Sequence, residues 1–423
     1  MVEKRNPIAV QEAVERVMQF AEEGIQETVK LEDSDGRILG EDIVATHAVP
    51  PFNKSPYDGF AFRAEDTATG SQENPITFKV TEHISAGKVA TQPLQKGEAV
   101  RIMTGAKLPE EANCVAMFEI CQTFEDQGQE YMSIKRSMNP GDNVNVKGSE
   151  TEEGTKLVYK GTSINPGVKA LLATFGYAYV TVAKRPKVGL FTTGTELLQV
   201  EDDLVPGKIR NSNASMVASQ IIRAGGEVQF YGTLQDDFAT SFEAISKALE
   251  EVDLMITTGG VSVGDYDLMP DIYQELGANV LFNKVAMRPG SVTTVASKGD
   301  KLLFGLSGNP SACYVGFELF TRPILRSLMG SKQPYPPKIK AYLAADFPKA
   351  NPFTRFVRSN LYYQDGNVYI QPSGLDKSSV VTSLASANAF MMLPGGTRGY
   401  EKGYLIDALL IEVNEGQADT WTF

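Results

Sequence analysis

The chain of 423 residues has few of the side chains on which cysteine and histidine chemistry depends. It contains three cysteines, Cys114, Cys121 and Cys313, and none stands in CxxC spacing, which argues against a disulfide scaffold or a cysteine-based zinc site. It contains two histidines, His47 and His83, so histidine triads and multi-histidine metal sites are nearly excluded. Any metal chemistry is therefore expected to use oxygen ligands, which suit Mg²⁺.

Long apolar runs and basic blocks are also missing. No stretch approaches the roughly 18 to 20 apolar residues of a membrane helix, so no membrane span is expected. The N-terminus, MVEKRNPIAVQEAVERV, is amphipathic and rich in acids, unlike a secretory or transit peptide, and a cytoplasmic location is expected. The 40 Lys and Arg against 52 Asp and Glu give a net charge of −12, which disfavours nucleic-acid binding.

Two familiar phosphate-binding motifs do not occur. The chain has no GxxxxGK[ST], which excludes a P-loop NTPase, and no GxGxxG after a strand, which disfavours a dinucleotide dehydrogenase. The length and the hydrophobic content of 42% instead indicate a globular protein of two to four domains.

The pattern along the chain changes several times. Residues 7–23 have helical periodicity, and residues 51–139 are short β-rich runs separated by Gly, Pro and Asn. Residues 140–182 are mixed in character. From residue 186, strands alternate with helices, which predicts a doubly wound, largely parallel sheet. After a Pro- and Lys-rich linker, residues 331–423 predict a small barrel or sandwich.

Three apolar runs in the alternating segment end in turns of small residues, FTTGTE (191–196), ITTGGVSVGD (256–265) and GLSGNPSA (305–312). The carboxyl ends of parallel strands lie along one edge of such a sheet, where ligands bind. Glycines admit a ligand to backbone N–H groups, and the helix start after GNPSA attracts anions. One such turn is typical of an ordinary strand–helix connection, but the three together predict a cradled anionic ligand.

Acidic residues accompany these turns: Glu196, Asp236, Asp237, Asp265 and Asp267. Carboxylates beside an anion repel it unless a cation lies between them, so a phosphate with Mg²⁺ is the economical interpretation. The alternative is that they are solvated loop acids or helix caps, which is the interpretation favoured for Asp237.

Positive partners follow in NKVAMRPGS, which contains Lys284 and Arg288. At this spacing in a strand the two side chains share one face. Taken alone, they would be unremarkable surface cations.

The turns TTGTEL, TTGGVSVGD and GNPSA, in this order, resemble the pterin-binding domain shared by proteins of molybdenum cofactor biosynthesis. Four further segments, SPYDGFA (55–61), RIMTGA (101–106), NVNVKGSE (143–150) and SLASANAFMMLP (383–394), are similar to those of the molybdopterin molybdenumtransferase family, which includes MoeA and the gephyrin E-domain. The resemblance covers essentially the whole chain, and GGVSVGD and these four segments, five motifs in family order, are strongly specific.

The resemblance implies an α/β multidomain fold. Domain I, elongated and mixed, comprises residues 1–50 and 140–182, and the inserted β-rich domain II comprises residues 51–139. Domain III, residues 183–330, is a three-layer α/β/α pterin-binding domain, and domain IV, residues 331–423, is a C-terminal β-barrel. Family members are homodimers in which the α/β domain of one subunit faces the inserted domain of the other.

The family reaction consumes adenylylated molybdopterin. Mg²⁺-assisted cleavage releases AMP, and molybdate is placed on the dithiolene sulfurs. The resemblance therefore implies Mg²⁺ as cofactor, and molybdate and adenylylated molybdopterin as substrates. The expected partners are a second copy of the chain, molybdopterin adenylyltransferase and molybdoenzyme chaperones, with no nucleic acid and no membrane.

The resemblance also implies site residues at the positions that match family motifs. The catalytic candidates are Asp58, Thr104, Glu150, Glu196, Asp236 and Asp267. The metal-ligand candidates are Glu196, Asp236, Asp265 and Asp267. The substrate-binding candidates are Thr193, Gly194, Gly259, Gly260, Ser262, Gly264, Lys284, Arg288, Gly308, Asn309, Pro310, Ser311 and Arg358, the last of which resembles an arginine that binds molybdate.

The chain departs from the family pattern at several positions. The family's NVRxxGxD is NVNVKGSE here, so Asn145 replaces an arginine and Glu150 an aspartate. The family's KPGKP is RPGSV, so Arg288 keeps the first charge and Ser291 loses the second; arginine is no neutral exchange, because its planar fork prefers bidentate geometry. Ser307 replaces a proline before GNP. These departures concern the molybdate contacts more than the reaction class.

Two other functions compete with this interpretation. A molybdopterin adenylyltransferase shares the α/β domain, but that activity needs only this one domain. A non-catalytic pterin-binding or scaffold paralogue is the second, since the related domain of gephyrin also clusters receptors. The intact Asp58, Glu196, Asp236 and Asp267 disfavour a purely structural role.

Overall fold

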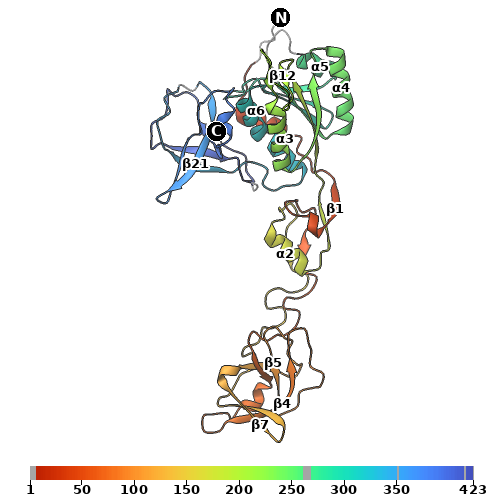
Figure 1. Cartoon of the computed structure of the whole chain (residues 1–423), viewed down its shortest axis with the longest axis vertical. Helices are drawn as coiled ribbons and strands as arrows, with labels where there is room; N and C mark the ends of the chain where they lie inside the picture. The colour runs from red at the N-terminus through yellow and green to blue at the C-terminus, as the bar shows by residue number, and fades with distance from the viewer. Residues whose placement is uncertain (1–5, 261–267, 350–351, 414–415, 423) are drawn as a thin grey trace. The chain divides into compact units, whose positions relative to one another are not determined.

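The computed structural model describes residues 6–260, 268–349, 352–413 and 416–422. The chain forms two compact units (Figure 1), of which the first comprises residues 1–41, 160–169 and 179–423, and the second residues 42–159 and 170–178. Each unit has hydrophobic cores of its own.

The second unit contains a six-stranded sheet of strand order β6-β3-β5-β4-β8-β7. In β4 the sequence ITFKVTEHI alternates, and Phe78, Val80 and Ile84 are buried, since successive side chains of a strand face opposite sides. The predicted β-rich character of this segment is confirmed. The strands and 3₁₀ turns are β3 (Gly59–Phe62), η2 (Ala64–Thr67), β4 (Ile76–Ile84), β5 (Glu98–Ile102), β6 (Cys114–Met117), η3 (Phe118–Ile120), β7 (Cys121–Asp126) and β8 (Gln129–Ile134).

A smaller layer of the second unit pairs β2 (Ile43–Val44) with β9 (Lys156–Val158). Tyr177 fixes this layer, because its hydroxyl accepts a hydrogen bond from the N–H of Val44 and donates one to the carbonyl of Val44. Helix α2 (Pro166–Thr174) contributes residues to both units.

The first unit is organised around a six-stranded sheet of order β14-β11-β15-β19-β18-β16. The first four strands are parallel, and β18 pairs antiparallel with β19 on one side and with β16 on the other, so the prediction of a largely parallel sheet is confirmed. The strands are β11 (Lys187–Thr193), β14 (Glu227–Leu234), β15 (Leu254–Thr258), β16 (Asn279–Phe282), β18 (Thr294–Lys298) and β19 (Lys301–Leu306).

Helices cover both faces of this sheet and form a three-layer α/β/α arrangement (Figure 1). In β15, Leu254 and Ile256 belong to the core on one face and Met255 to the core on the other. The first face carries α1 (Val10–Met18), α3 (Ser212–Ala224), α6 (Pro310–Gly316), the π-helical turn η4 (Phe317–Thr321) and α7 (Arg322–Leu328). The second face carries α4 (Phe238–Glu251) and α5 (Met269–Glu275).

Helix α1 is shorter than the predicted helix over 7–23. Ile8 forms a bridge with Val285 instead, donating its N–H to the carbonyl of Lys284 and accepting from Ala286. After the helix the chain turns and enters β1 (Gln26–Lys30), which pairs antiparallel with β10 (Tyr179–Ala183); η1 (Leu31–Asp33) follows β1. Tertiary pairing at both ends thus overrides the helical periodicity.

The C-terminal segment forms a closed five-stranded barrel, because β21 pairs with both β22 and β23 and the chain of pairings returns through β20 and β24. The short β17 (Met287–Arg288) adds to β21. Phe356, Phe390 and Leu409 join the core on the α1–α3 face of the sheet. The remaining elements are β20 (Lys338–Leu343), β21 (Thr354–Gln364), β22 (Asn367–Pro372), η5 (Thr382–Leu384), β23 (Ala389–Leu393) and β24 (Leu405–Leu410).

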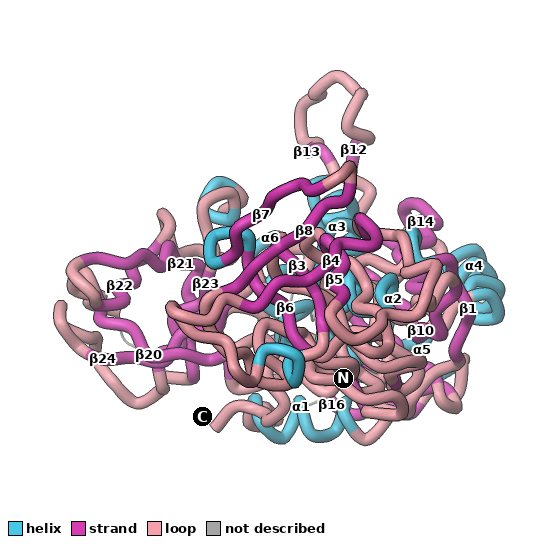
Figure 2. Tube along the Cα trace, turned by 90° about the horizontal axis from the view of Figure 1, so that it is seen from below, coloured by secondary structure: helices cyan, strands magenta, loops and turns pink. Residues whose placement is uncertain are grey.

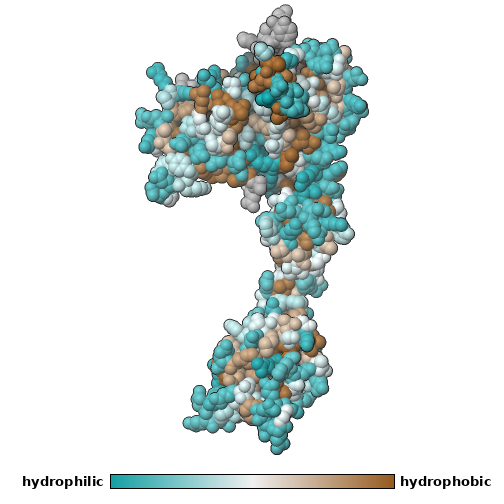
Figure 3. All heavy atoms as spheres, in the orientation of Figure 1, coloured by the Kyte–Doolittle hydropathy of each residue, from teal (hydrophilic) through white to brown (hydrophobic). Residues whose placement is uncertain are grey.

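A loop joins β12 (Leu197–Leu198) to β13 (Ile209–Arg210) and extends away from these two paired strands (Figure 2). Hydrophobic side chains gather at this position on the surface (Figure 3), and those exposed on the loop and β13 are Val200, Leu204, Val205 and Ile209. Among the helices of the described chain, none has the length and apolar character needed to cross a membrane.

Candidate active site

A pocket of about 520 Å³ lies at the carboxyl ends of β11, β14, β15 and β19. The three predicted small-residue turns supply its walls, as expected from the parallel strands that precede them. The predicted site residues that line it are Thr193, Gly194, Glu196, Asp236, Gly259, Gly260, Gly308 and Asn309.

Glycine is required where two of these turns meet. Gly259 has φ +85°, and a Cβ built there would lie 2.6 Å from Oγ1 and 2.8 Å from the carbonyl oxygen of Thr193. A Cβ on Gly308 would lie 3.4 Å from Cα of Gly259. A larger residue is therefore excluded at Gly259, where the first two turns meet, and the third turn lies in van der Waals contact with them at Gly308.

Among the described residues that line the pocket, Glu196 and Asp236 carry carboxylates. The Glu196 carboxylate lies over Gly194, since a Cβ on that glycine would be 2.5 Å from Oε2. Among the residues that the structure describes, no three or more His, Cys, Asp or Glu side chains are grouped to hold a metal. Two carboxylates nevertheless fit Mg²⁺, which proteins usually bind through one or two carboxylates and the phosphates of a substrate.

The neighbouring Asp237 has a structural role. It is the N-cap of α4, and its Oδ1 accepts hydrogen bonds from the hydroxyl (2.6 Å) and the N–H (2.8 Å) of Thr240. The two bonds lower the pKa of Asp237, the hydroxyl contributing most. These contacts agree with the interpretation of Asp237 as a helix cap, whereas the neighbouring Asp236 lines the pocket.

Behind the pocket lies a layer of buried polar side chains that the sequence reasoning missed. Asn211 caps α3, accepting from the N–H of Ala214, and its Nδ2 donates to Thr192, whose hydroxyl bonds that of Thr233. Asn213 donates from Nδ2 to the carbonyl of Gly308 at 2.9 Å. The signal was Asn-Ser-Asn directly before an apolar helical pattern, which is typical of a helix start.

The third turn also contacts the C-terminal barrel. Ser311 follows Pro310 in α6, donating its N–H to Ser378 and its hydroxyl to Val380, both at backbone carbonyls. Arg358 is 2% exposed in β21, and its Nη2 donates to the carbonyls of Leu375 and Lys377 in the same loop.

Lys284 and Arg288 do not share a strand. Lys284 lies between β16 and β17, whereas Arg288 belongs to β17. The carbonyl of Lys284 accepts a hydrogen bond from the N–H of Ile8, so it does not pair within a continuing strand. The expectation that strand spacing places both on one face is therefore wrong, and neither residue lines the pocket.

In the second unit, Asp58 and Thr104 lie together. Oδ1 of Asp58 accepts hydrogen bonds from the N–H (2.7 Å) and the hydroxyl (2.8 Å) of Thr104. Glu150 is exposed, and its N–H donates to the carbonyl of Val49. Four further candidates, Ser262, Gly264, Asp265 and Asp267, lie outside the described residues.

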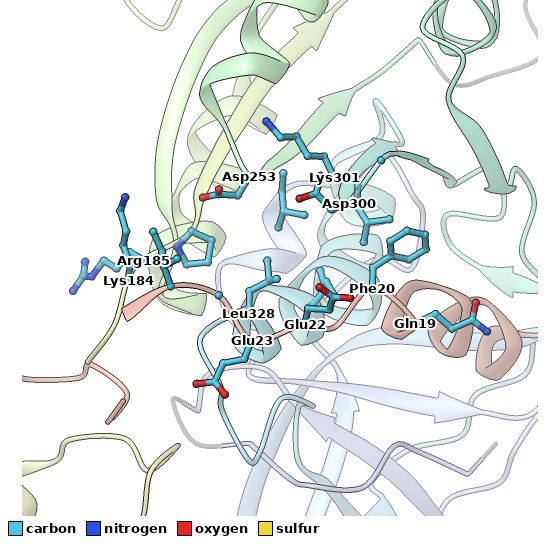
Figure 4. Close-up of a pocket in the computed structure, with 17 residues that line it drawn as sticks. Gln19, Phe20, Glu22, Glu23, Lys184, Arg185, Asp253, Asp300, Lys301 and Leu328 are labelled. Carbon is cyan, nitrogen blue, oxygen red and sulfur yellow. The ribbon is translucent and has the colours of Figure 1, made fainter. Parts of the chain in front are cut away.

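A second pocket, of about 530 Å³, lies at the opposite edge of the same sheet (Figure 4). None of the predicted site residues that the structure describes lines it. Two of its charged side chains stabilise local structure: Asp253 accepts from the N–H of Lys187, and Lys301 donates to the carbonyl of Leu249.

Fold and pocket together define a class of protein, a multidomain α/β protein with a small-ligand site at the carboxyl edge of its sheet. Sequence comparison narrows the class. Residues 8–176 match the MoeA N-terminal region (domain I and II), residues 189–327 a probable molybdopterin binding domain, and residues 340–411 the MoeA C-terminal region (domain IV). The chain belongs to the MoeA family of molybdopterin molybdenumtransferases, enzymes of molybdenum cofactor biosynthesis.

Individual relatives agree. The molybdopterin molybdenumtransferase of Bacillus subtilis (strain 168) is 57% identical over 422 residues, covering 100% of this chain and 98% of the relative. That of Staphylococcus aureus (strain MRSA252) is 48% identical, covering 99% of each chain. A crystal structure of a molybdopterin biosynthesis MoeA protein from Pyrococcus horikoshii matches with a TM-score of 0.84 at 31% identity, covering 96% of this chain and 100% of the other.

Proposed function

We propose that the chain inserts molybdate into adenylylated molybdopterin with release of AMP. The observation that carries this proposal is the pocket in which three small-residue turns meet Glu196 and Asp236. The small residues Thr193, Gly194, Gly259 and Gly308 line the pocket and let a phosphorylated pterin approach the backbone. The two carboxylates supply the oxygen ligands that a cation beside a pyrophosphate needs.

In the proposed reaction, each part of the pocket has its own task. The glycine turns bind and orient the substrate, and Glu196 and Asp236 would hold Mg²⁺ next to the pyrophosphate. Bound Mg²⁺ would neutralise the charge that develops on the leaving AMP phosphate. Asp265 and Asp267 follow the glycines of the turn TTGGVSVGD in the sequence and are proposed to assist Glu196 and Asp236. Lys284, Arg288 and Arg358 are proposed to attract molybdate.

Asp58, Thr104 and Glu150 are proposed to act on the same substrate from the partner subunit of a homodimer. The exposed hydrophobic residues of the β12–β13 loop, next to the pocket residue Ile209, support association with a second copy. The four-domain division at residues 50, 139, 182 and 330 is proposed together with this assembly. Molybdopterin adenylyltransferase, which makes the substrate, and molybdoenzyme chaperones are proposed partners.

The test mixes the purified chain with adenylylated molybdopterin, Mg²⁺ and molybdate and follows AMP release and active cofactor. We expect AMP release that stops with EDTA and returns with Mg²⁺. Asp236→Asn should raise the Mg²⁺ concentration needed for half-maximal rate, whereas Asp253→Asn, at the opposite edge of the sheet, should not. A folded protein that makes adenylylated molybdopterin from ATP but releases no AMP from it would favour the adenylyltransferase instead.

A further inference from the structure

A cluster of cations surrounds Asp376 in the C-terminal barrel. Lys349 Nζ and Arg355 Nη1 lie 3.0 and 2.8 Å from Oδ2 of Asp376, and Arg358 Nη1 lies 3.9 Å from Oδ1. The Asp376 side chain is 7% exposed and that of Arg358 only 1%. Arg288 is the register partner of Arg355 across β17 and β21. Positive charge thus exceeds negative charge at this site.

The two oxygens of the Asp376 carboxylate do not provide an acceptor for every donor in this cluster. Oδ2 serves two cations, whereas the 3.9 Å between Oδ1 and Arg358 Nη1 is longer than a hydrogen bond. Arg358 Nη1 is buried and has no hydrogen-bond partner among the described residues. The other guanidinium nitrogens are engaged, Nε with Ser383 and Nη2 with backbone carbonyls. A buried donor left without an acceptor is costly, which points to a ligand with more oxygens than a carboxylate has.

The position of the cluster ties it to the candidate active site. Asp376 belongs to the loop whose Ser378 and Val380 carbonyls accept hydrogen bonds from Ser311 (3.0 and 2.6 Å). Ser311 follows closely after Asn309, which lines the pocket. The Asp376 loop is therefore hydrogen-bonded directly to the third turn of the pocket.

We propose that Asp376 is an internal counter-anion that holds the cationic cluster until a tetrahedral oxyanion displaces it, and that Lys349 and Arg355 then bind that oxyanion together with Arg358. Taking molybdate as the oxyanion rests on the proposed function. A tetrahedral dianion carries four oxygens and twice the charge of a carboxylate, so it can serve Lys349, Arg355 and Arg358 Nη1 at once. The displaced carboxylate sets the affinity, because every binding event has to break its ion pairs with Lys349 and Arg355.

The test measures molybdate binding to the full chain by titration calorimetry without pterin. Asp376→Asn keeps the size of the side chain and removes the competing charge, so molybdate is expected to bind roughly tenfold more tightly. The matched control is Asp407→Asn, which removes the same charge from an ion pair with Lys340 in the same barrel and is expected to change affinity less than twofold. Equal or weaker binding by a folded D376N variant would overturn the proposal.

If circular dichroism shows that D376N does not fold, a second variant, Lys349→Gln, tests the proposal. Lys349 has a side chain that is 43% exposed, so Lys349→Gln is tolerated and is expected to weaken molybdate binding several-fold. Unchanged binding by K349Q would overturn the proposal. Tighter molybdate binding by D376N, in a chain that releases no AMP, would refute only the proposed function. AMP release by the chain, with molybdate binding unaltered in both variants, would refute only the role of Asp376.

Discussion

The carboxylate of Asp58 is held by Thr104 through two hydrogen bonds, from the N–H at 2.7 Å and from the hydroxyl at 2.8 Å. The backbone bond, followed by the hydroxyl bond, lowers the pKa of Asp58 below its ordinary value. Because this pKa is lower in the folded chain than in the unfolded one, the contribution to stability is present above the ordinary pKa and is lost as the pH falls through the folded value. At neutral pH Asp58 is therefore an oriented, ionised carboxylate.

Replacing Thr104 by Val removes the hydroxyl bond and keeps the N–H bond. We expect the pKa of Asp58 to rise toward its ordinary value and AMP release to fall, because the carboxylate loses its orientation. Carboxyl NMR titration measures the pKa. Thr240→Val is the matched control: it removes the equivalent hydroxyl from Asp237, should raise that pKa, and should leave turnover nearly unchanged. An unmoved Asp58 pKa in T104V would contradict the prediction.

Gly259→Ala should destroy the pocket geometry. The new Cβ would meet Thr193 at 2.6 and 2.8 Å, and the residue would also keep φ +85°, which is unfavourable for alanine. Gly232→Ala provides a control in β14, since it has φ +99° and no atom within 4 Å of its Cβ. We expect both variants to lose about 1 to 2 kcal/mol of stability from backbone strain. Only G259A should lose substrate binding as well, and equal binding constants would refute the required close approach.

Asn213→Ala should affect the third turn of the pocket. Loss of the Nδ2 donor leaves the Gly308 carbonyl unpaired, which costs about 1 to 3 kcal/mol and loosens the turn that faces the substrate. We therefore expect a higher KM for the pterin substrate. Asn388→Ala breaks two comparable bonds to Leu361 in the barrel and should lower Tm without changing KM. The same KM in both variants would assign Asn213 a purely structural role.

Glu318→Gln tests a buried ion cluster. Glu318 is fully buried in the π-helical turn, where it accepts hydrogen bonds from Arg223 and, at 3.1 Å, from Arg322. Removing its charge leaves buried cations unpaired, and urea denaturation should show a loss of about 3 to 5 kcal/mol.

Glu412→Gln serves as the control for that variant. Glu412 pairs with Arg223 at 3.3 Å but its side chain is 57% exposed, so its loss should cost less than about 1 kcal/mol. Equal costs for the two glutamates would show that burial does not decide the strength of these pairs.

Much of the fold and of the pocket could be predicted because the relevant signals are local. The alternation of strands with helices from residue 186 predicted the largely parallel sheet, whose strands bring their carboxyl ends together, but it did not predict the antiparallel pairing of β18 with β16 and β19. The errors arose where distant segments pair. Ile8 was predicted to lie in the N-terminal helix, but its N–H donates a hydrogen bond to the carbonyl of Lys284. Lys284 was predicted to lie in a strand, and this same contact takes the place of strand pairing.

The sequence by itself determined the class of the fold, the three turns and their acids, since apolar periodicity and glycine turns act over a few residues. Only the tertiary structure decided where other charges lie: Asp236 lines the pocket, Lys284 lies outside a strand, and Arg358 lies buried beside Asp376. The physical reason is that charges act through space. Burial and hydrogen-bond partners determine whether a carboxylate binds a ligand or a backbone, and these depend on residues far away in the chain.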